Sequence, residues 1–313
     1  MADSRAVPLT VIGGFLGAGK TTLLNALLAQ TDDRRIAVLV NDFGDLQIDA
    51  ALIAQSTATT ISLRNGCVCC SLAGGLINAL SESLAIDPRP DHVVVEASGV
   101  SDPRRIAQVA RSGAGFSPEA TVVVVATDQI EELACDRYVG DTVTAQLAAA
   151  DLLILSKIDL VDASRKPAVR QWLATSAPHA TLIEALNGDV PIELVLGPTA
   201  QAVSLRGLKE SDHGDHGQRF TAHVFRCAIP LGETKLNSVI QQLPPGVFRL
   251  KGLVRLDSNP QRLRLVQGVR TRCSISDAPP HIEQEGSTLV VIGAKGLLND
   301  SDLAGMRDLF NGH

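Results

Sequence analysis

Short apolar runs alternate with stretches of helical periodicity through the first two thirds of the chain. The runs are apolar almost throughout, which is typical of strands buried on both faces of a sheet. They read VPLTVIGG (7–14), IAVLVND (36–42), TTISLRNG (59–66), HVVVEASG (92–99), TVVVVATD (121–128) and LLILSKID (152–159). Helical stretches lie between them, for example at 20–30, 72–84 and 102–113. This alternation predicts an α/β fold with a doubly wound, mostly parallel sheet.

The pattern changes after Gly197. The segment Gly197–Gln218 is rich in Gly, Ser, Asp and His, which is typical of a linker. Beyond it the expected strands lie at 220–230, 247–256, 262–276 and 287–294, and the helical stretches at 233–243 and 301–310. Strands that follow one another without intervening helices predict a smaller α+β domain with an antiparallel sheet. We therefore expect an α/β domain at 1–197, a linker at 198–218 and an α+β domain at 219–313.

Composition and charge narrow the class of protein. The 313 residues carry a net charge of −6, and basic residues do not cluster beyond a pair, which argues against nucleic acid or an anionic membrane as a partner. The apolar runs are far shorter than the roughly 20 residues of a membrane helix. The start MADSRAVPLTVIGG lacks the charged-then-apolar profile of a signal peptide, and six cysteines in such a chain indicate a reducing compartment. We expect a cytoplasmic protein.

The stretch GGFLGAGKT matches the P-loop pattern G-x-x-x-x-G-K-[ST] from Gly14 to Thr21, between an expected strand and an expected helix. Glycines let backbone N–H groups turn towards the α- and β-phosphates, aided by the positive end of the following helix. Lys20 can reach the β- and γ-phosphates, and the Thr21 hydroxyl can ligate Mg²⁺. A plain glycine-rich turn rarely supplies Lys and Thr in register. The expected nucleotide contacts here are Gly14, Gly17, Ala18, Gly19, Lys20, Thr21 and Thr22.

The tetrapeptide SKID, Ser156 to Asp159, ends an apolar run where the base-reading loops of GTPases lie. The Asp159 carboxylate can accept hydrogen bonds from guanine N1–H and N2–H₂ together, which adenine cannot offer. The aliphatic stem of Lys157 can pack on the base. GTPases usually have Asn at the first position, so Ser156 is a departure. The alternative interpretation is that Lys157 and Asp159 are an ordinary solvated pair on the surface, which is common after a strand.

Two further loops after expected strands carry acidic residues. Glu96 in VVVEASGVSDP can act on Mg²⁺ directly or through water, and a carboxylate at a helix N-terminus is the alternative. Gly99 lies where a backbone N–H can sense the γ-phosphate. Asp42 in VNDFGDLQID is a hard oxygen ligand suited to Mg²⁺ or to a second metal. Asp45 and Asp49 are expected to be solvated.

A thiol cluster follows the expected strand at 59–66. The stretch GCVCCSL contains Cys67, Cys69 and Cys70 immediately before a helical stretch, and a helix N-terminus lowers the pKa of a thiol and favours the thiolate. A thioredoxin-like redox loop also uses C-x-x-C before a helix, but exchange needs two sulfurs and not three. Three thiolates with a fourth ligand make a tetrahedral site suited to Zn²⁺ or a related borderline metal.

The other candidate metal ligands are scattered along the chain. Cys135, Cys227 and Cys273 have no clustered partner and are expected to be buried small hydrophobes. His213 and His216 have H-x-x-H spacing within the linker. Weak metal binding is the alternative for this pair, but we expect the two histidines to be ordinary polar residues of the linker.

These motifs, in this order, resemble the CobW family of GTPase metallochaperones along nearly the whole chain. GGFLGAGKTTLLN is similar to the family's P-loop, VNDFG to its following loop and GCVCCSL to its C-x-C-C signature. VVVEASGVSDP resembles the third GTPase motif and SKID the base motif, while FRLKGLVRL, VQGV and LVVIGAKGL resemble the CobW C-terminal domain. Asp42 stands where many members have Glu, and the linker has few histidines beside the His-rich runs of many relatives.

The resemblance implies a GTP-driven metal carrier that uses GTP, Mg²⁺ and Zn²⁺ or Co²⁺ and delivers metal to a client metalloprotein. We expect Lys20, Thr21 and Glu96 to carry out hydrolysis. Because sites gather at the carboxyl ends of parallel strands, the thiols and the γ-phosphate should be near neighbours, with GTP ordering the loops around the metal. Two alternatives stay open: a P-loop kinase or ATPase with a structural zinc, and a metal-sensing regulatory module with vestigial hydrolysis.

Overall fold

The chain divides into two compact units, Met1–Leu196 and Gly197–His313. The computed structural model describes residues 6–31, 34–40, 59–62, 72–112, 115–198, 220–244, 246–269, 272–278, 284–294, 298 and 301–311. The linker expected at 198–218 lies almost wholly outside these residues. Among the described residues, no helix combines the length and the apolar character that crossing a bilayer requires.

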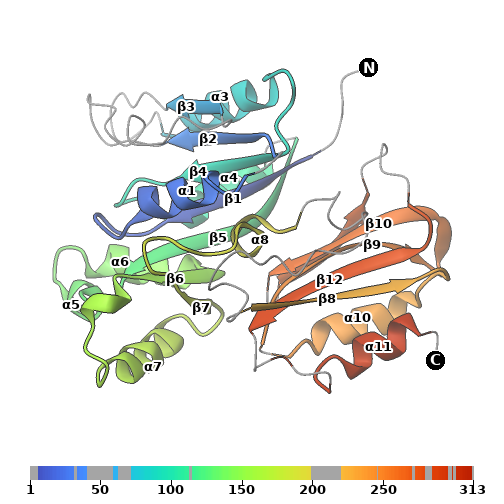
Figure 1. The fold of residues 1–313 in the computed structure, drawn as a ribbon. Coiled ribbons are helices and arrows are strands. Elements are labelled where there is room, and N and C mark those ends of the chain that lie inside the picture. The colour runs from blue at the N-terminus through green and yellow to red at the C-terminus, as the bar shows by residue number, and fades with distance from the viewer. Residues whose placement is uncertain are drawn as a thin grey trace. The chain divides into compact units, whose positions relative to one another are not determined.

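The first unit is a seven-stranded sheet with helices on both faces (Figure 1). Its strands are β1 (Val7–Gly13), β2 (Ile36–Val40), β3 (Thr59–Ser62), β4 (His92–Glu96), β5 (Phe116–Ala126), β6 (Leu152–Ser156) and β7 (Thr181–Glu184). Its helices are α1 (Lys20–Leu28), α3 (Leu72–Leu84), α4 (Pro103–Ser112), α5 (Ile130–Cys135), α6 (Gly140–Ala149), α7 (Lys166–Ser176) and α8 (Ile192–Leu196), with a 3₁₀ turn at Ile158–Leu160.

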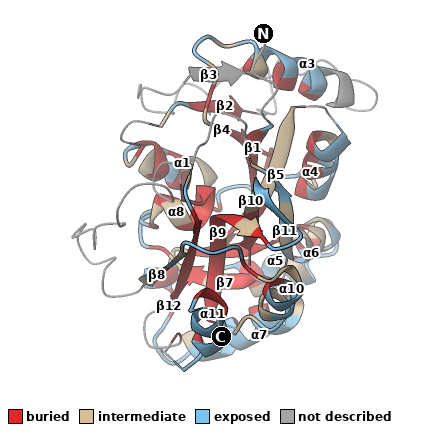
Figure 2. Ribbon diagram, turned by 90° about the vertical axis from the view of Figure 1, so that its right-hand side faces the viewer, coloured by how far each residue is buried: buried red, intermediate tan, exposed pale blue. Residues whose placement is uncertain are grey.

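The strand order is β3-β2-β4-β1-β5-β6-β7, and all six strand pairs are parallel. The predicted doubly wound α/β fold is therefore confirmed, and the sheet is wholly rather than mostly parallel. Helices α3 and α4 pack on β1, β2 and β4, and helices α5, α6 and α7 pack on β5 and β6. Strands β2 and β4 are buried along their length and β5 is buried in its second half, while the helices expose their outer sides (Figure 2).

The parallel register brings the ends of the central strands to one edge of the sheet. Ile12 in β1 lies opposite Glu96 at the end of β4, and Ala126 at the end of β5 lies opposite Ser156 at the end of β6. The Ala97 backbone N–H donates to the Ile12 carbonyl at 2.8 Å, so the loop after β4 starts beside the loop after β1. The loops that follow β1, β4, β5 and β6 therefore form one continuous edge.

The second unit is a five-stranded antiparallel sheet in the order β11-β10-β9-β12-β8, which agrees with the predicted α+β pattern. Its elements are β8 (Phe220–Cys227), α10 (Glu233–Gln241), β9 (Val247–Leu256), β10 (Asn259–Val269), β11 (Arg272–Asp277), β12 (Ser287–Ala294) and α11 (Ala304–Phe310). Apolar residues of α10 and α11 pack with those of the sheet into one cluster.

Two sequence predictions need correction. The run 262–276 was expected as one strand, but β10 and β11 form an antiparallel pair in which Val269 lies opposite Arg272. Gly268 is the one Gly or Pro in this run, and it lies within β10 rather than between the two strands, so the sequence gives only a weak turn signal there. Strand β7 was not predicted, because four residues reading TLIE have too little apolar character to stand out.

Candidate nucleotide-binding site

The loop between β1 and α1 depends on glycine at two positions. Gly14 has a φ of +132°, and a Cβ at this position would lie 2.3 Å from the carbonyl oxygen of Val124 in β5. Gly19 has a φ of 97° and directly precedes α1. Because L side chains rarely adopt such angles, glycine lets the loop pass close to β5 and then begin the helix.

Lys20 is the first residue of α1 and is half-buried. Its Nζ donates a hydrogen bond to the carbonyl oxygen of Phe15 at 3.2 Å, so the ammonium group lies against the loop. The backbone N–H groups at the start of a helix carry partial positive charge. Their combination with the Lys20 ammonium makes this loop suited to an anionic ligand such as a phosphate chain.

Thr21 and Glu96 meet beside the same loop. The Thr21 hydroxyl donates to Glu96 Oε1 at 3.1 Å, and Glu96 is only 3% exposed at the end of β4. Helix α4 does not begin until Pro103, so Glu96 is not an N-terminal residue of that helix. A hydroxyl and a carboxylate are hard oxygen donors, which is the kind of ligand that Mg²⁺ prefers. The residues present therefore fit a magnesium site.

The loop after β4 lies against the phosphate loop. A Cβ at Gly99 would lie 2.4 Å from Leu16 Cδ2 and 2.8 Å from the Leu16 backbone nitrogen. Within the loop, the hydroxyl oxygens of Ser98 and Ser101 are 2.6 Å apart, and the Ser101 N–H donates to the Ser98 carbonyl at 3.0 Å. Glycine at 99 thus permits a close approach between the two loops that any side chain would prevent.

The SKID stretch follows β6 on the same edge. The Ser156 Oγ lies 2.6 Å from the carbonyl oxygen of Ala18 in the phosphate loop and 3.0 Å from that of Val125, so its hydroxyl can donate to either. Lys157 has a φ of 53°, which turns the chain into the 3₁₀ turn, where Asp159 is exposed. The serine at the position of the usual asparagine therefore connects the SKID loop to the phosphate loop.

Several predicted site residues lie outside the described part of the chain. They are Asp42, Cys67, Cys69, Cys70, His213 and His216, together with the acidic residues Asp45 and Asp49. Within the described part, no group of three or more His, Cys, Asp or Glu residues is arranged to hold a metal ion. The thiol cluster and its metal thus remain predictions from the sequence.

The three remaining cysteines differ in their surroundings. The prediction that Cys135 is buried is wrong, because this residue ends the short helix α5 and is exposed. Cys227 and Cys273 are half-buried and pack against the apolar cluster of the second unit. Desolvation raises the pKa of the Cys227 thiol and raises that of Cys273 to about 11. A raised pKa disfavours the thiolate, which is the form of cysteine that binds a metal.

Sequence reasoning missed two residues near the site. Gln146 in α6 is 2% exposed, and its Nε2 donates to carbonyl oxygens in the loop after β4. Gly188, after β7, has a φ of 75° and lies so close to α1 that a Cβ would be 2.8 Å from the Cα of Leu23. A polar residue within the apolar stripe of α6 was the available signal for Gln146, whereas Gly188 gave none beyond its turn propensity.

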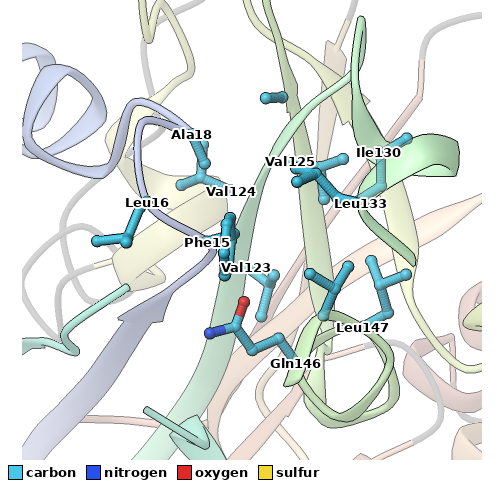
Figure 3. Close-up of a pocket in the computed structure, with 12 residues that line it drawn as sticks. Phe15, Leu16, Ala18, Val123, Val124, Val125, Ile130, Leu133, Gln146 and Leu147 are labelled. Atoms are coloured by element: carbon cyan, nitrogen blue, oxygen red, sulfur yellow. The ribbon is translucent and has the colours of Figure 1, made fainter. Parts of the chain in front are cut away.

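A pocket lies behind the phosphate loop, between β5 and the helices α5 and α6 (Figure 3). Phe15, Leu16 and Ala18 of the loop contribute to its lining, and the other side chains are apolar except for Gln146. An apolar lining cannot hold a phosphate chain, because it offers no donors to charged oxygens. The pocket is therefore not the candidate phosphate site.

Comparisons with known proteins extend these observations. The nucleotide-binding domain model shared by CobW, HypB and UreG matches residues 8–184, and the C-terminal domain model of the cobalamin synthesis protein CobW matches residues 220–310. A zinc chaperone CobW from a Sinorhizobium species is 32% identical over 350 residues, covering 98% of this chain and 97% of its own. The zinc chaperone YjiA of Escherichia coli is 28% identical, covering 92% and 94%.

Among solved structures, the Zn(II)-bound YjiA GTPase from E. coli is 22% identical with a TM-score of 0.47, covering 97% of this chain and 99% of its own. The fold, the phosphate loop and the domain model define a P-loop nucleotide-binding protein. With both domain models matched in order, this chain belongs to the CobW family.

Proposed function

We propose that this protein is a GTP-hydrolysing metallochaperone. It binds a transition metal at Cys67, Cys69 and Cys70, with Zn²⁺ as the first candidate and Co²⁺ as the second, and delivers it to a client metalloprotein. Nucleotide state controls the transfer. We assign the nucleotide chemistry to residues 1–197, which the linker 198–218 joins to a second domain at 219–313.

The observation that carries the nucleotide assignment is the meeting of Lys20, Thr21 and Glu96 at one loop. Lys20 would neutralise charge at the β- and γ-phosphates, and the backbone N–H groups from Gly14 to Thr22 would hold the phosphate oxygens. Thr21 and Glu96 would hold Mg²⁺, which would supply positive charge to the phosphate chain. The hydrolytic step then depends on positioning and on charge stabilisation.

The choice of GTP rests on the loop after β6. Asp159 is exposed, so its carboxylate is accessible to a base. The Ser156 hydroxyl links this loop to the carbonyl oxygen of Ala18, so the loop proposed to bind the base and the phosphate loop are held in a fixed relative position. A carboxylate that accepts from guanine N1–H and N2–H₂ would meet no equivalent pair of donors on adenine. Lys157 would cover the face of the ring with its aliphatic stem.

The metal cargo is supported by thiol chemistry and by the relatives. Strand β3 runs parallel to β2 and β4, so it ends at the same edge of the sheet as the phosphate loop. Cys67, Cys69 and Cys70 come soon after β3 in the sequence. Three thiolates suit Zn²⁺ and also bind Co²⁺. The E. coli and Sinorhizobium relatives are both named zinc chaperones. Asp42 comes two positions after the end of β2 in the sequence and is a further candidate ligand.

Hydrolysis by the wild type and by Lys20→Ala tests the nucleotide assignment. The wild type should release phosphate from Mg²⁺–GTP, and excess ATP should not compete. Lys20→Ala should lower kcat on the order of 10²-fold or more, because it removes a charge that acts on the transferring phosphoryl group. Thermal unfolding should be nearly unchanged, because the Lys20 side chain contributes no core packing.

Lys166→Ala is the matched control, since Lys166 is the first residue of α7 as Lys20 is of α1. It should hydrolyse GTP at the wild-type rate. Normal GTP hydrolysis by a folded Lys20→Ala protein would contradict the P-loop assignment. Equal competition by ATP would instead favour an ATPase or kinase with a structural zinc.

A further inference from the structure

Helix α6 carries a buried glutamine on the side that packs against the sheet. Val143, Gln146 and Leu147 follow the i, i+3, i+4 spacing of one helix face, and each is at most 2% exposed. Gln146 is the polar side chain in the lining of the pocket behind the phosphate loop, where apolar neighbours surround it (Figure 3). A buried amide is unfavourable unless it is hydrogen-bonded, so its partners indicate its purpose.

Those partners belong to the loop between β4 and α4. Gln146 Nε2 donates to the carbonyl oxygens of Gly99 and Ser101, each at 3.0 Å. Both hydrogens of one amide group are therefore used on this loop, on either side of Val100. Val100 itself is 44% exposed, so the loop is held from its inner side while its outer side faces solvent.

The phosphate loop limits the same segment from the other side. Gly99 is packed so closely on Leu16 that no Cβ fits between them. The Ser98–Ser101 contact closes the segment on itself. The position of Gly99 is thus determined by three features: the phosphate loop, the serine pair and the amide of Gln146.

We propose that Gln146 is a positioning residue for the γ-phosphate. Gln146 holds the carbonyls of Gly99 and Ser101, so it fixes the peptide groups that follow these two residues. The Gly99 N–H belongs to the preceding peptide, whose Ser98 carbonyl accepts from the Ser101 N–H at 3.0 Å, so fixing Gly99 and Ser101 also fixes the direction of this N–H. This direction determines how strongly the site distinguishes a triphosphate from a diphosphate, and how well the γ-phosphate is held for hydrolysis. The inference rests on the proposed nucleotide site, but it concerns the phosphate end and not the base.

Gln146→Met tests the proposal, because methionine keeps the length of the side chain and the apolar pocket while removing both donors. Affinities for a non-hydrolysable GTP analogue and for GDP should be measured together with kcat. We expect the ratio of the two affinities to fall by at least about fivefold, the effect of one or two lost neutral hydrogen bonds, with kcat falling as well. GDP affinity should be unchanged, and backbone amides 99–101 should exchange hydrogen faster.

Gln30→Met is the matched control. Gln30 Nε2 also donates to two carbonyl oxygens, those of Ala26 at 3.0 Å and Val190 at 3.1 Å, but at the far end of α1. This variant should keep the wild-type affinity ratio and kcat even if its melting temperature falls. Gln146→Leu offers a second apolar side chain and should behave as Gln146→Met does.

An unchanged affinity ratio and kcat in Gln146→Met would overturn the proposal. An equal loss of GTP-analogue and GDP affinity would overturn it too, because that is the result of general destabilisation. If the wild type prefers adenine nucleotides, the guanine assignment is wrong, but the ratio measured with an ATP analogue and ADP still decides the role of Gln146. The two failures are therefore distinguishable.

Discussion

Asp159 is the residue on which base selection depends in the proposed site. Asp159→Asn should weaken GTP binding by about 1–3 kcal/mol, because it replaces a charged acceptor of two hydrogen bonds by a neutral amide. ATP binding should be poor in both proteins. Competition against a fluorescent guanine nucleotide measures the change. Asp162→Asn, an exposed aspartate three residues further along, is the control and should bind GTP normally. A wild type that prefers ATP would contradict the assignment.

The residues of the phosphate site could be predicted because their signals are local in the chain. The spacing of GGFLGAGKT is enough to indicate Lys20 and Thr21, and Glu96 ends an apolar run. Gln146 could not be assigned, since its partners lie 47 and 45 positions away. Cys135 was expected to be buried because cysteine usually is, but α5 has only six residues and ends in solvent.

The connection from β1 to α1 is the element on which the phosphate site depends. Gly14→Ala should abolish nucleotide binding or prevent folding, because its Cβ would lie 2.3 Å from the Val124 carbonyl oxygen at a φ of +132°. Gly17 also has a positive φ, of 71°, but a Cβ there meets no atom within 4 Å. Gly17→Ala should therefore cost only about 1–2 kcal/mol of stability from backbone strain. Thermal unfolding with and without GDP measures both. Equal behaviour of the two variants would contradict the account.

At the scale of elements, the strands buried on both faces were predicted well because a continuous apolar run is a strong signal. Strand β5 nevertheless begins at Phe116, before the run at 121–128, since its first residues are only half-buried and include polar ones. Strand β7 and the break between β10 and β11 were missed because pairing with a neighbouring strand, and not local composition, defines them.

At the scale of the whole molecule, the account joins a nucleotide site to a thiol cluster. Replacing Cys67, Cys69 and Cys70 by Ser should eliminate tight, stoichiometric Zn²⁺ binding, because serine hydroxyls stay protonated and are poor ligands for borderline metals. GTP binding should remain, because Lys20 and Asp159 are unchanged. Metal content after dialysis measures the loss. Replacing Cys135, Cys227 and Cys273 by Ser is the control and should leave one tightly bound metal. Loss of the metal in the control would place the site elsewhere.

The central claim is that nucleotide state controls the metal, and a titration of the wild type with Zn²⁺ tests it most directly. Affinity should be measured with Mg²⁺ and a GTP analogue, and again with Mg²⁺ and GDP. We expect tighter Zn²⁺ binding in the triphosphate state by about 1–3 kcal/mol, the usual scale of coupling between two sites, and an equal tightening of the GTP analogue by Zn²⁺. Identical Zn²⁺ affinities in the two states would contradict the account, since a GTPase and a metal site without coupling do not make a carrier.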